Sequence, residues 1–129
     1  MRLRGALTLA FLGFLLPAVL PAQIRTNAGF RQKSIPANDD GSAPIESLGW
    51  TANFFGRMRS TVFVNNNGNI TFDAALPTFT PFGLTNTGRE IIAPFFSDVD
   101  TRPQGSALVT YGHDTIDGRR AFAANYVSV

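Results

Sequence analysis

Two carboxylates separated by one residue are the pair in this 129-residue sequence best placed to do chemistry. Asp98 and Asp100 lie in an extended stretch, where alternate side chains point to the same side. With Asp73, Thr101 or nearby carbonyl oxygens they could supply the oxygen ligands that Ca²⁺ prefers. The alternative is structural, with the carboxylates accepting backbone N–H bonds or pairing with a nearby arginine. No cleft is indicated that would make them the acid and base of a hydrolase.

The single histidine, His113, is the other residue that could take part in catalysis. Asp114 is next to it and Ser106 or Thr110 precedes it, but adjacency in sequence does not give the geometry of a catalytic triad. The Gly-x-Ser-x-Gly elbow is also absent. One histidine and no cysteine leave too few of the usual ligands for a zinc site. We therefore expect His113 to lie in a solvated turn, and we expect no enzyme and no cofactor other than the candidate calcium.

An aromatic cluster and an asparagine cluster are the remaining candidates for ligand binding. Trp50, Phe54 and Phe55 could form a platform for sugars, although core packing is the simpler interpretation. The asparagines of the run Asn65–Asn69 could form a polar binding loop. Because asparagine tolerates left-handed backbone and caps its own turn, we favour a structural turn. Asn69-Ile70-Thr71 is also an N-glycosylation sequon.

The first 22 residues have the composition of a secretory signal peptide. Arg2 and Arg4 give a basic start, an apolar stretch covers Ala6 to Leu20, and Ala22 precedes a polar sequence. The apolar stretch is shorter than the roughly 20 residues that span a bilayer. We predict cleavage after Ala22 and a protein that is secreted or displayed at the cell surface. An uncleaved membrane anchor is the alternative.

Charge and cysteine content restrict the partners and the source. Without Arg2 and Arg4, the chain has equal numbers of basic and acidic residues. Nucleic acids and anionic membranes need a clustered basic face, so neither is expected as a partner. No cysteine is present, which excludes a disulfide scaffold. Secreted animal matrix proteins usually contain disulfides, so an exported bacterial protein is favoured.

The composition predicts an all-β domain. Turn formers and β-formers are abundant, and no stretch repeats apolar residues at helical spacing. We expect an antiparallel, sandwich-like domain. Residues 23–44 are interpreted as an extended lead-in, residues 45–129 as the domain, and residues 74–89 as a long irregular loop. Strands are expected at residues 50–55, 60–65, 69–73, 90–96, 107–111 and 121–127.

The hairpin at residues 60–73 gives the strongest local signal. Asn67-Gly68 favours a two-residue type I′ turn, because both central positions of that turn need positive φ. This register places Phe63 opposite Phe72. A cross-strand aromatic pair stabilises such a ladder by roughly 0.2–1 kcal/mol. We therefore predict that the phenylalanine face of the hairpin is core.

Three motifs together carry a family resemblance. They are Phe54-Phe55-Gly56, the run VFVNNNGNITF at residues 62–72 and the run IIAPFFSDVD at residues 91–100. In this order they resemble the nidogen-like (NIDO) domain family, over about residues 45–129. Phe96 stands where that family often has tryptophan. The resemblance implies an extracellular, non-catalytic module of cell–matrix adhesion type, with a matrix or cell-surface protein or glycan as its partner.

Two other interpretations remain open. One is a carbohydrate-binding accessory module of a secreted enzyme, which retention on insoluble polysaccharide would reveal. The other is a non-functional gene fragment. Tyr126 to Val129 still has a strand pattern, and the domains of the family that the sequence resembles are longer. We therefore expect the domain to be incomplete at its C-terminal end.

Overall fold

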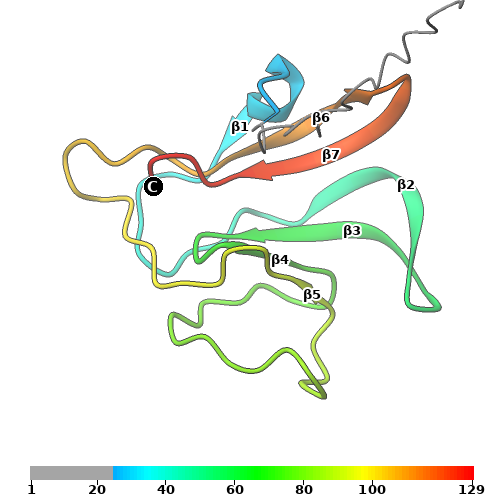
Figure 1. Cartoon of the computed structure of the whole chain (residues 1–129), viewed down its shortest axis with the longest axis horizontal. Coiled ribbons are helices and arrows are strands. Elements are labelled where there is room, and N and C mark those ends of the chain that lie inside the picture. Colours follow the sequence, from blue (N-terminus) through cyan, green and yellow to red (C-terminus); the bar gives the residue numbers. More distant parts are fainter. Residues whose placement is uncertain (1–24) are drawn as a thin grey trace, which may run out of the picture.

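A computed structural model describes residues 25–129, so the predicted signal peptide at residues 1–22 lies outside the described part. The described chain forms two antiparallel sheets, one of three strands in the order β1-β6-β7 and one of four in the order β2-β3-β4-β5 (Figure 1). The prediction of an all-β, sandwich-like domain is confirmed. The elements are η1 (Ala28–Arg31), β1 (Lys33–Ser34), β2 (Glu46–Phe54), β3 (Arg57–Asn65), β4 (Asn69–Thr71), β5 (Ile91–Ile92), β6 (Thr110–Ile116) and β7 (Arg119–Asn125).

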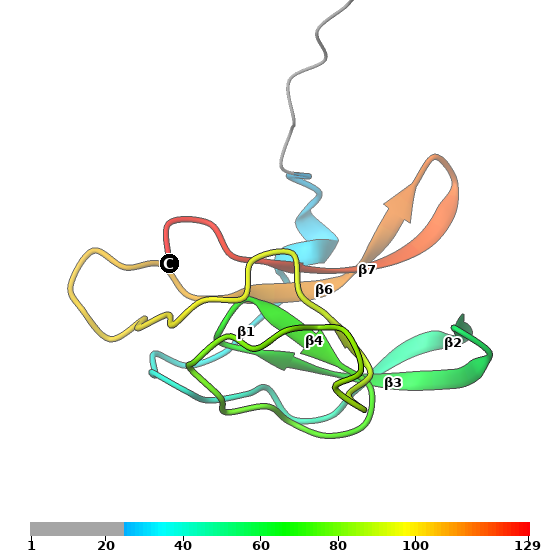
Figure 2. The ribbon, with the colours of Figure 1, turned by 60° about the horizontal axis from the view of Figure 1, so that its bottom comes forward.

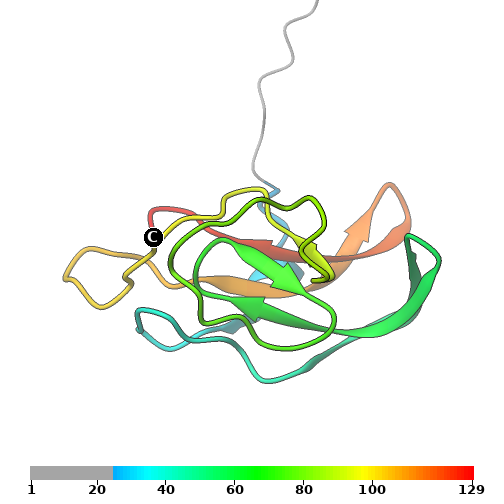
Figure 3. The ribbon, with the colours of Figure 1, turned by 90° about the horizontal axis from the view of Figure 1, so that it is seen from below.

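The core lies where the two sheets face each other. Figure 2 shows β6 and β7 as one layer and β2, β3 and β4 as the other. Val62 and Val64 of β3 are fully buried, and Tyr111 of β6 is nearly so. Ile70 and Phe122 pack against both apolar clusters of this core and so link them. The β2–β3 and β6–β7 hairpins extend beyond the shared core on the same side of the molecule (Figure 3).

The predicted register of the β3–β4 hairpin is wrong by one residue. Asn65 pairs with Asn69, and Phe63 pairs with Thr71. The loop therefore has three residues, Asn66 to Gly68, and only Gly68 has positive φ (77°). This geometry suits a type I turn followed by a left-handed residue, not a type I′ turn.

The shift in register changes which side chains of the hairpin face the core. Val62, Val64 and Phe72 are buried with the apolar face, whereas Phe63 lies on the other face and is only half-buried. The predicted pairing of Phe63 with Phe72 does not form. A one-residue slip moves every side chain of a strand to the opposite face, which explains the reversal.

Type I′ turns occur in the two other hairpins. Asp117 and Gly118 have φ of 51° and 73° between the paired residues Ile116 and Arg119. The turn predicted at Asp117-Gly118 is therefore confirmed. Phe55 and Gly56 have φ of 48° and 87° at the tip of the β2–β3 hairpin. A left-handed backbone is unusual for a residue as bulky as phenylalanine. The side chain of Phe55 is also 93% exposed.

Two predicted strands differ from those observed. The strand expected at residues 90–96 is reduced to β5, and Pro94, which cannot donate to a ladder, follows soon after it. The strand expected at residues 107–111 begins only at Thr110 and continues to Ile116. His113 therefore lies within a strand, and the prediction that it lies in a turn is wrong. Residues 74–89 contain no helix or strand, as expected.

The segment interpreted as a lead-in contributes to the fold. Phe30 of η1 is fully buried, and Ile35, directly after β1, is 3% exposed. β1 pairs with β6, and Ile35 N–H donates to Val109 O at 2.9 Å. The residues before Ile45 therefore cover one side of the core. The domain boundary at Ile45 itself stays a prediction.

Candidate functional site

The tip of the β3–β4 hairpin connects two other loops through buried amides. Asn67 Nδ2 donates to Asp40 Oδ1 at 2.9 Å, and Asn67 Oδ1 accepts from Val99 N at 2.9 Å. Asn66 Nδ2 donates to Asp39 O at 2.6 Å and also to Val99 O. Both asparagines are 1% exposed. The hairpin tip thereby holds the loop around residues 38–41 against the loop around residues 97–101.

A second pair of asparagines fills the base of the same hairpin. Asn65 Nδ2 donates to Asn69 Oδ1 at 2.8 Å and to Thr71 Oγ1 at 3.0 Å. Asn65 Oδ1 accepts from Ser42 Oγ at 2.7 Å and from Leu76 N at 3.0 Å. Because these buried amides already have partners, the asparagine run has little capacity left to bind a ligand. The sequon residue Asn69 is 0% exposed as well.

The two predicted calcium ligands have different neighbours in the structure. Asp100 accepts from Arg102 Nε at 2.7 Å, and the hydrogen bonds from Arg102 lower the pKa of Asp100 to about 2. Asp98 instead lies near Asp39 and Asp40, and their carboxylate oxygens come within 4.8 Å of one another. Sequence reasoning missed Asp39 and Asp40, since only the folded hairpin brings their loop to Asp98.

Neighbouring groups already engage two carboxylates of this acidic cluster. Arg102 Nη2 reaches Asp39 Oδ2 at 2.7 Å, and Asn67 donates to Asp40. The other oxygen donors proposed from the sequence are also engaged: Asp73 pairs with Arg89 at 3.2 Å, and Thr101 Oγ1 donates to Asn38 O at 2.9 Å. Calcium binding at Asp98 and Asp100 stays a prediction.

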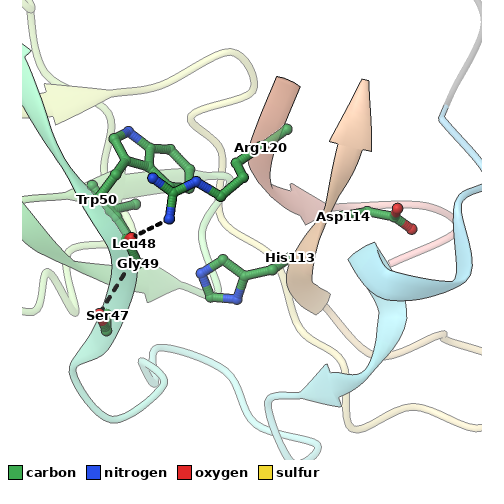
Figure 4. A pocket seen from close by; sticks show the side chains of 8 residues that line it. Ser47, Leu48, Gly49, Trp50, His113, Asp114 and Arg120 are labelled. Carbon is green, nitrogen blue, oxygen red and sulfur yellow. Dashed lines mark hydrogen bonds between the residues drawn. The ribbon is translucent and has the colours of Figure 1, made fainter. Parts of the chain in front are cut away.

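A second region of interest is a hollow of about 310 Å³ where β2 diverges from β6 and β7 (Figure 4). The register between β2 and β3 shifts between Ser47 and Ala52, and Gly49 in this stretch has φ of 74°. The residues that line the hollow are Ser47, Leu48, Gly49, Trp50, His113, Asp114, Arg120 and Ala121.

His113 and Asp114 do not form part of a catalytic triad. The His113 ring lies edge-on to Trp50, with 6.4 Å between ring centroids, and at 5.1 Å from Phe122. Asp114 points away from His113 in Figure 4, and its carboxylate accepts from Thr115 N at 2.7 Å and from Gly29 N at 3.0 Å. These two backbone bonds lower the pKa of Asp114. Ser106 lies outside β6 and donates weakly to Ala107 O.

The predicted aromatic platform does not form as one surface. Phe54 packs against Phe72 and Phe55, with centroid distances of 4.7 and 4.8 Å. The ring contact of Trp50 is with His113 instead. Trp50 and Phe54 both pack against the buried cluster of Leu48, Val62 and Phe72, as core packing predicts, and Trp50 also lines the hollow.

A buried carboxylate that sequence reasoning missed lies beside β3. Glu90 accepts from Arg59 Nε at 2.5 Å and from Arg57 Nη1 at 2.8 Å, and it is 6% exposed. The hydrogen bonds from Arg59 and then Arg57 lower the pKa of Glu90 to about 2. Arg57 and Arg59 are separated by one residue on a strand, so their side chains share a face. This spacing was the sequence signal that could have pointed to a shared carboxylate partner.

Comparisons with known proteins agree with this architecture. Residues 60–128 match the nidogen-like domain family. The chain is 42% identical to mouse alpha-tectorin over 84 residues, which is 64% of this chain and 4% of the relative. It is 43% identical to human alpha-tectorin over 72 residues, which is 54% of this chain and 3% of that relative. No solved structure gives a significant match.

The chain spans only a small part of these relatives, which are animal proteins and so give no support to a bacterial source. No helix within residues 25–129 is long and apolar enough to cross a membrane. Two of the three sequence motifs, the hairpin at residues 62–72 and the run at residues 91–100, lie inside the matched residues. Since the match covers more than half of the sequence, the chain belongs to the nidogen-like domain family.

Proposed function

We propose that this chain is an exported, non-catalytic binding module of extracellular-matrix type. The observation that carries the proposal is the match of residues 60–128 to the nidogen-like domain, together with the similarity to alpha-tectorin. Fold and family support the kind of module, and the partner has to be argued from its surface. The partner class is a matrix or cell-surface protein or glycan, and not a nucleic acid.

The fixed arrangement of loops supports a binding role. Asn66 and Asn67 hold three loops together through hydrogen bonds inside the fold. A surface that is already ordered loses little conformational freedom when a partner binds. The module can therefore present loops and sheet faces to a partner without first having to fold them.

The carboxylates support a non-catalytic role. Glu90 and Asp100 both have pKa values lowered to about 2 by paired arginines, so both are ionised at neutral pH. A general acid needs a carboxyl group with a raised pKa. Asp114 is held by backbone N–H groups and does not orient His113. These four residues therefore have roles in the fold or at its surface.

Export can be tested directly. The full chain is expressed with a C-terminal tag, and the culture medium, membranes and cell contents are separated. We expect the tagged protein in the medium or at the cell surface, with Gln23 as its first residue by mass spectrometry. Tagged protein that stays inside the cell with Met1 intact would contradict export.

Binding is tested by the retention of the exported chain on cell-free matrix. We expect saturable retention that untagged chain competes away. Retention on insoluble neutral polysaccharide, competed by free sugar, would instead favour a carbohydrate-binding accessory module. No retention on any matrix would contradict the proposed function.

A further inference from the structure

The hollow beside Trp50 combines a flat aromatic side chain with hydrogen-bonding side chains. Its volume of about 310 Å³ is at the lower end of the roughly 300–1,000 Å³ of small-ligand pockets. Leu48 is 5% exposed, so its side chain is part of the core beneath the hollow. Trp50 is half-buried, whereas His113 and Arg120 are exposed at its edge. This size suits one ring of a ligand whose remainder extends into solvent.

Arg120 supplies a positive charge at the edge of the hollow. Arg120 Nη1 donates to Gly49 O at 2.8 Å, and Arg120 forms no ion pair with any residue in the range 25–129. A guanidinium has five N–H donors, so donors remain for a ligand. The carboxylate of Asp114 points away and is held by Gly29 N and Thr115 N. The side of the hollow next to Arg120 therefore complements an anion.

The backbone of β2 borders the hollow at Gly49. A Cβ added at Gly49 would meet nothing within 4 Å, and the register shift in this stretch interrupts the regular β2–β3 ladder. The carbonyl of Gly49 binds the Arg120 guanidinium and so fixes it beside Trp50 (Figure 4). A positioned arginine favours planar recognition of a carboxylate by two parallel hydrogen bonds.

We propose that this hollow binds one uronate unit of an acidic polysaccharide. The apolar face of the sugar ring packs against the Trp50 indole, and its carboxylate pairs with Arg120. His113 and Ser47 offer polar groups to the sugar hydroxyls at the edge. This inference rests on the proposed function, because it names the chemical class of partner for the same matrix-type module.

The probe is a tetrasaccharide of alternating glucuronate and N-acetylglucosamine, titrated into the full exported chain. Trp50 is the single tryptophan of the chain, so intrinsic fluorescence reports on the hollow directly. We expect a saturable change in fluorescence. Reduction of the carboxylates to alcohols should weaken binding at least about tenfold, since charge-assisted hydrogen bonds are lost.

Two neighbouring arginines provide a matched pair of variants. Arg120→Gln should weaken binding at least about tenfold, because it removes the positive charge from the hollow. Arg119→Gln removes the same charge from the adjacent position of β7, which does not line the hollow, and should change affinity less than about twofold. Trp50→Phe keeps an aromatic ring and should weaken binding about threefold, measured by calorimetry.

Several results would overturn the inference. One is the absence of a Trp50 signal with the tetrasaccharide, and another is an equal loss of affinity in both arginine variants, which would indicate non-specific attraction. Equal binding of a glutamate-rich peptide would assign the hollow to a protein partner instead. If the chain is exported and retained on matrix but gives any of these results, this inference fails and the proposed function stands.

Discussion

Buried amides, and not only apolar side chains, hold the β3–β4 hairpin in place. Asn65 is 0% exposed and forms hydrogen bonds with four groups from three parts of the chain. An unsatisfied buried polar group costs about 1–3 kcal/mol, so such a cluster stabilises one arrangement only when it is complete. Single asparagines are therefore the residues at which substitution is most informative.

Asn65→Ala should lower the free energy of unfolding by about 2–4 kcal/mol, because it leaves Leu76 N and Asn69 Oδ1 buried without their partner. Denaturant unfolding followed by circular dichroism measures the loss. Asn53→Ala is the matched control, since Asn53 is exposed and has a single bond to Gly56 N. The control should lose less than about 1.5 kcal/mol. An equal loss in both variants would contradict the buried network.

Glu90 predicts a pH dependence of stability. Folding lowers the pKa of Glu90 from 4.5 to about 2, so the folded state binds fewer protons than the unfolded state in that range. Its stabilisation is complete above pH 4.5 and is lost as the pH falls toward about 2. Glu90→Gln should flatten the fall in unfolding free energy over this window. An unchanged slope would contradict the role of the Arg57 and Arg59 pairs.

Asp100 provides the control, because its pKa is lowered over a similar range by Arg102 at an exposed position. Salt screens exposed pairs far more than buried ones. In about 1 M NaCl, Asp100→Asn should change the pH dependence of the unfolding free energy less than it does at low salt. The effect of Glu90→Gln on that pH dependence should persist, since Glu90 is 6% exposed. Equal screening of both parts would show that Glu90 is solvated.

A calcium ion bound at the acidic cluster would raise the melting temperature, so adding EDTA tests for one. Asp98, Asp39 and Asp40 lie close together, but Arg102 and Asn67 already engage two of them. We expect no large change in melting temperature when EDTA is added. A fall of several degrees, restored by Ca²⁺ and absent in Asp98→Asn, would establish a calcium site there.

At the scale of elements, hairpin turns decide which faces reach the core. The sequence identifies the hairpin through Asn67-Gly68, but its loop length depends on contacts outside it. Asn66 N–H donates to Gly41 O at 2.9 Å, and Ser97 N–H donates to Asn67 O at 3.3 Å. These distant loops stabilise a three-residue tip, so local turn preference alone gave the wrong register. Within residues 25–129, no hydrogen bond joins the Asp117-Gly118 turn to another loop. Local turn preference was therefore sufficient to predict that turn.

Gly68→Val should destabilise the domain by at least about 4 kcal/mol, because a β-branched residue at positive φ is strained and its Cβ would collide with the Phe95 carbonyl. Gly118→Val is the matched control. Gly118 also has positive φ, but a Cβ there meets nothing within 4 Å, so its cost should be only about 2 kcal/mol. Thermal and denaturant unfolding compare the two. A smaller loss at Gly68 than at Gly118 would contradict the close packing of the tip.

At the scale of the whole molecule, the two sheets share one core, and distant segments complete it. Tyr126 follows β7, and its single O–H donor lies between two carbonyl acceptors of the four-stranded sheet, Asn65 O at 2.9 Å and Asn69 O at 2.8 Å. Burial raises the pKa of Tyr126. Residues 28–35 pack against β6, and β1 pairs with the edge of β6 that faces away from β7.

Composition and strand pattern were sufficient to predict the all-β fold. They could not predict that a polar N-terminal segment would bury Phe30 and Ile35, because that burial depends on tertiary packing.

A chain beginning at Ile45 should therefore fail to fold cooperatively. It lacks Phe30 and Ile35, which are 0% and 3% exposed. Each loss costs about 2–5 kcal/mol, against a total stability of about 5–15 kcal/mol. A chain beginning at Gln23 is the control, and the dispersion of amide NMR signals distinguishes folded from unfolded protein. Native-like dispersion in the shorter chain would instead confirm a domain boundary at Ile45.

The same dependence on tertiary contacts limited the prediction of the candidate sites. Asp98 was identified from its spacing, but its neighbours Asp39 and Asp40 come from a loop that only the folded hairpin brings close. Trp50 was identified as a candidate for a sugar platform, with core packing as the simpler interpretation, whereas His113 and Arg120 join it from another sheet. Residue types indicated which side chains could bind, and their partners depended on how the two sheets pack.

The most direct test of the account is the retention of the exported chain on cell-free matrix, measured for three proteins at one temperature. That temperature is chosen so that the wild type and Gly118→Val are folded and Gly68→Val is unfolded, as judged by circular dichroism. We predict saturable retention of the two folded proteins and none of Gly68→Val. Equal retention of all three, or no retention of the wild type, would contradict a binding module whose surface depends on this fold.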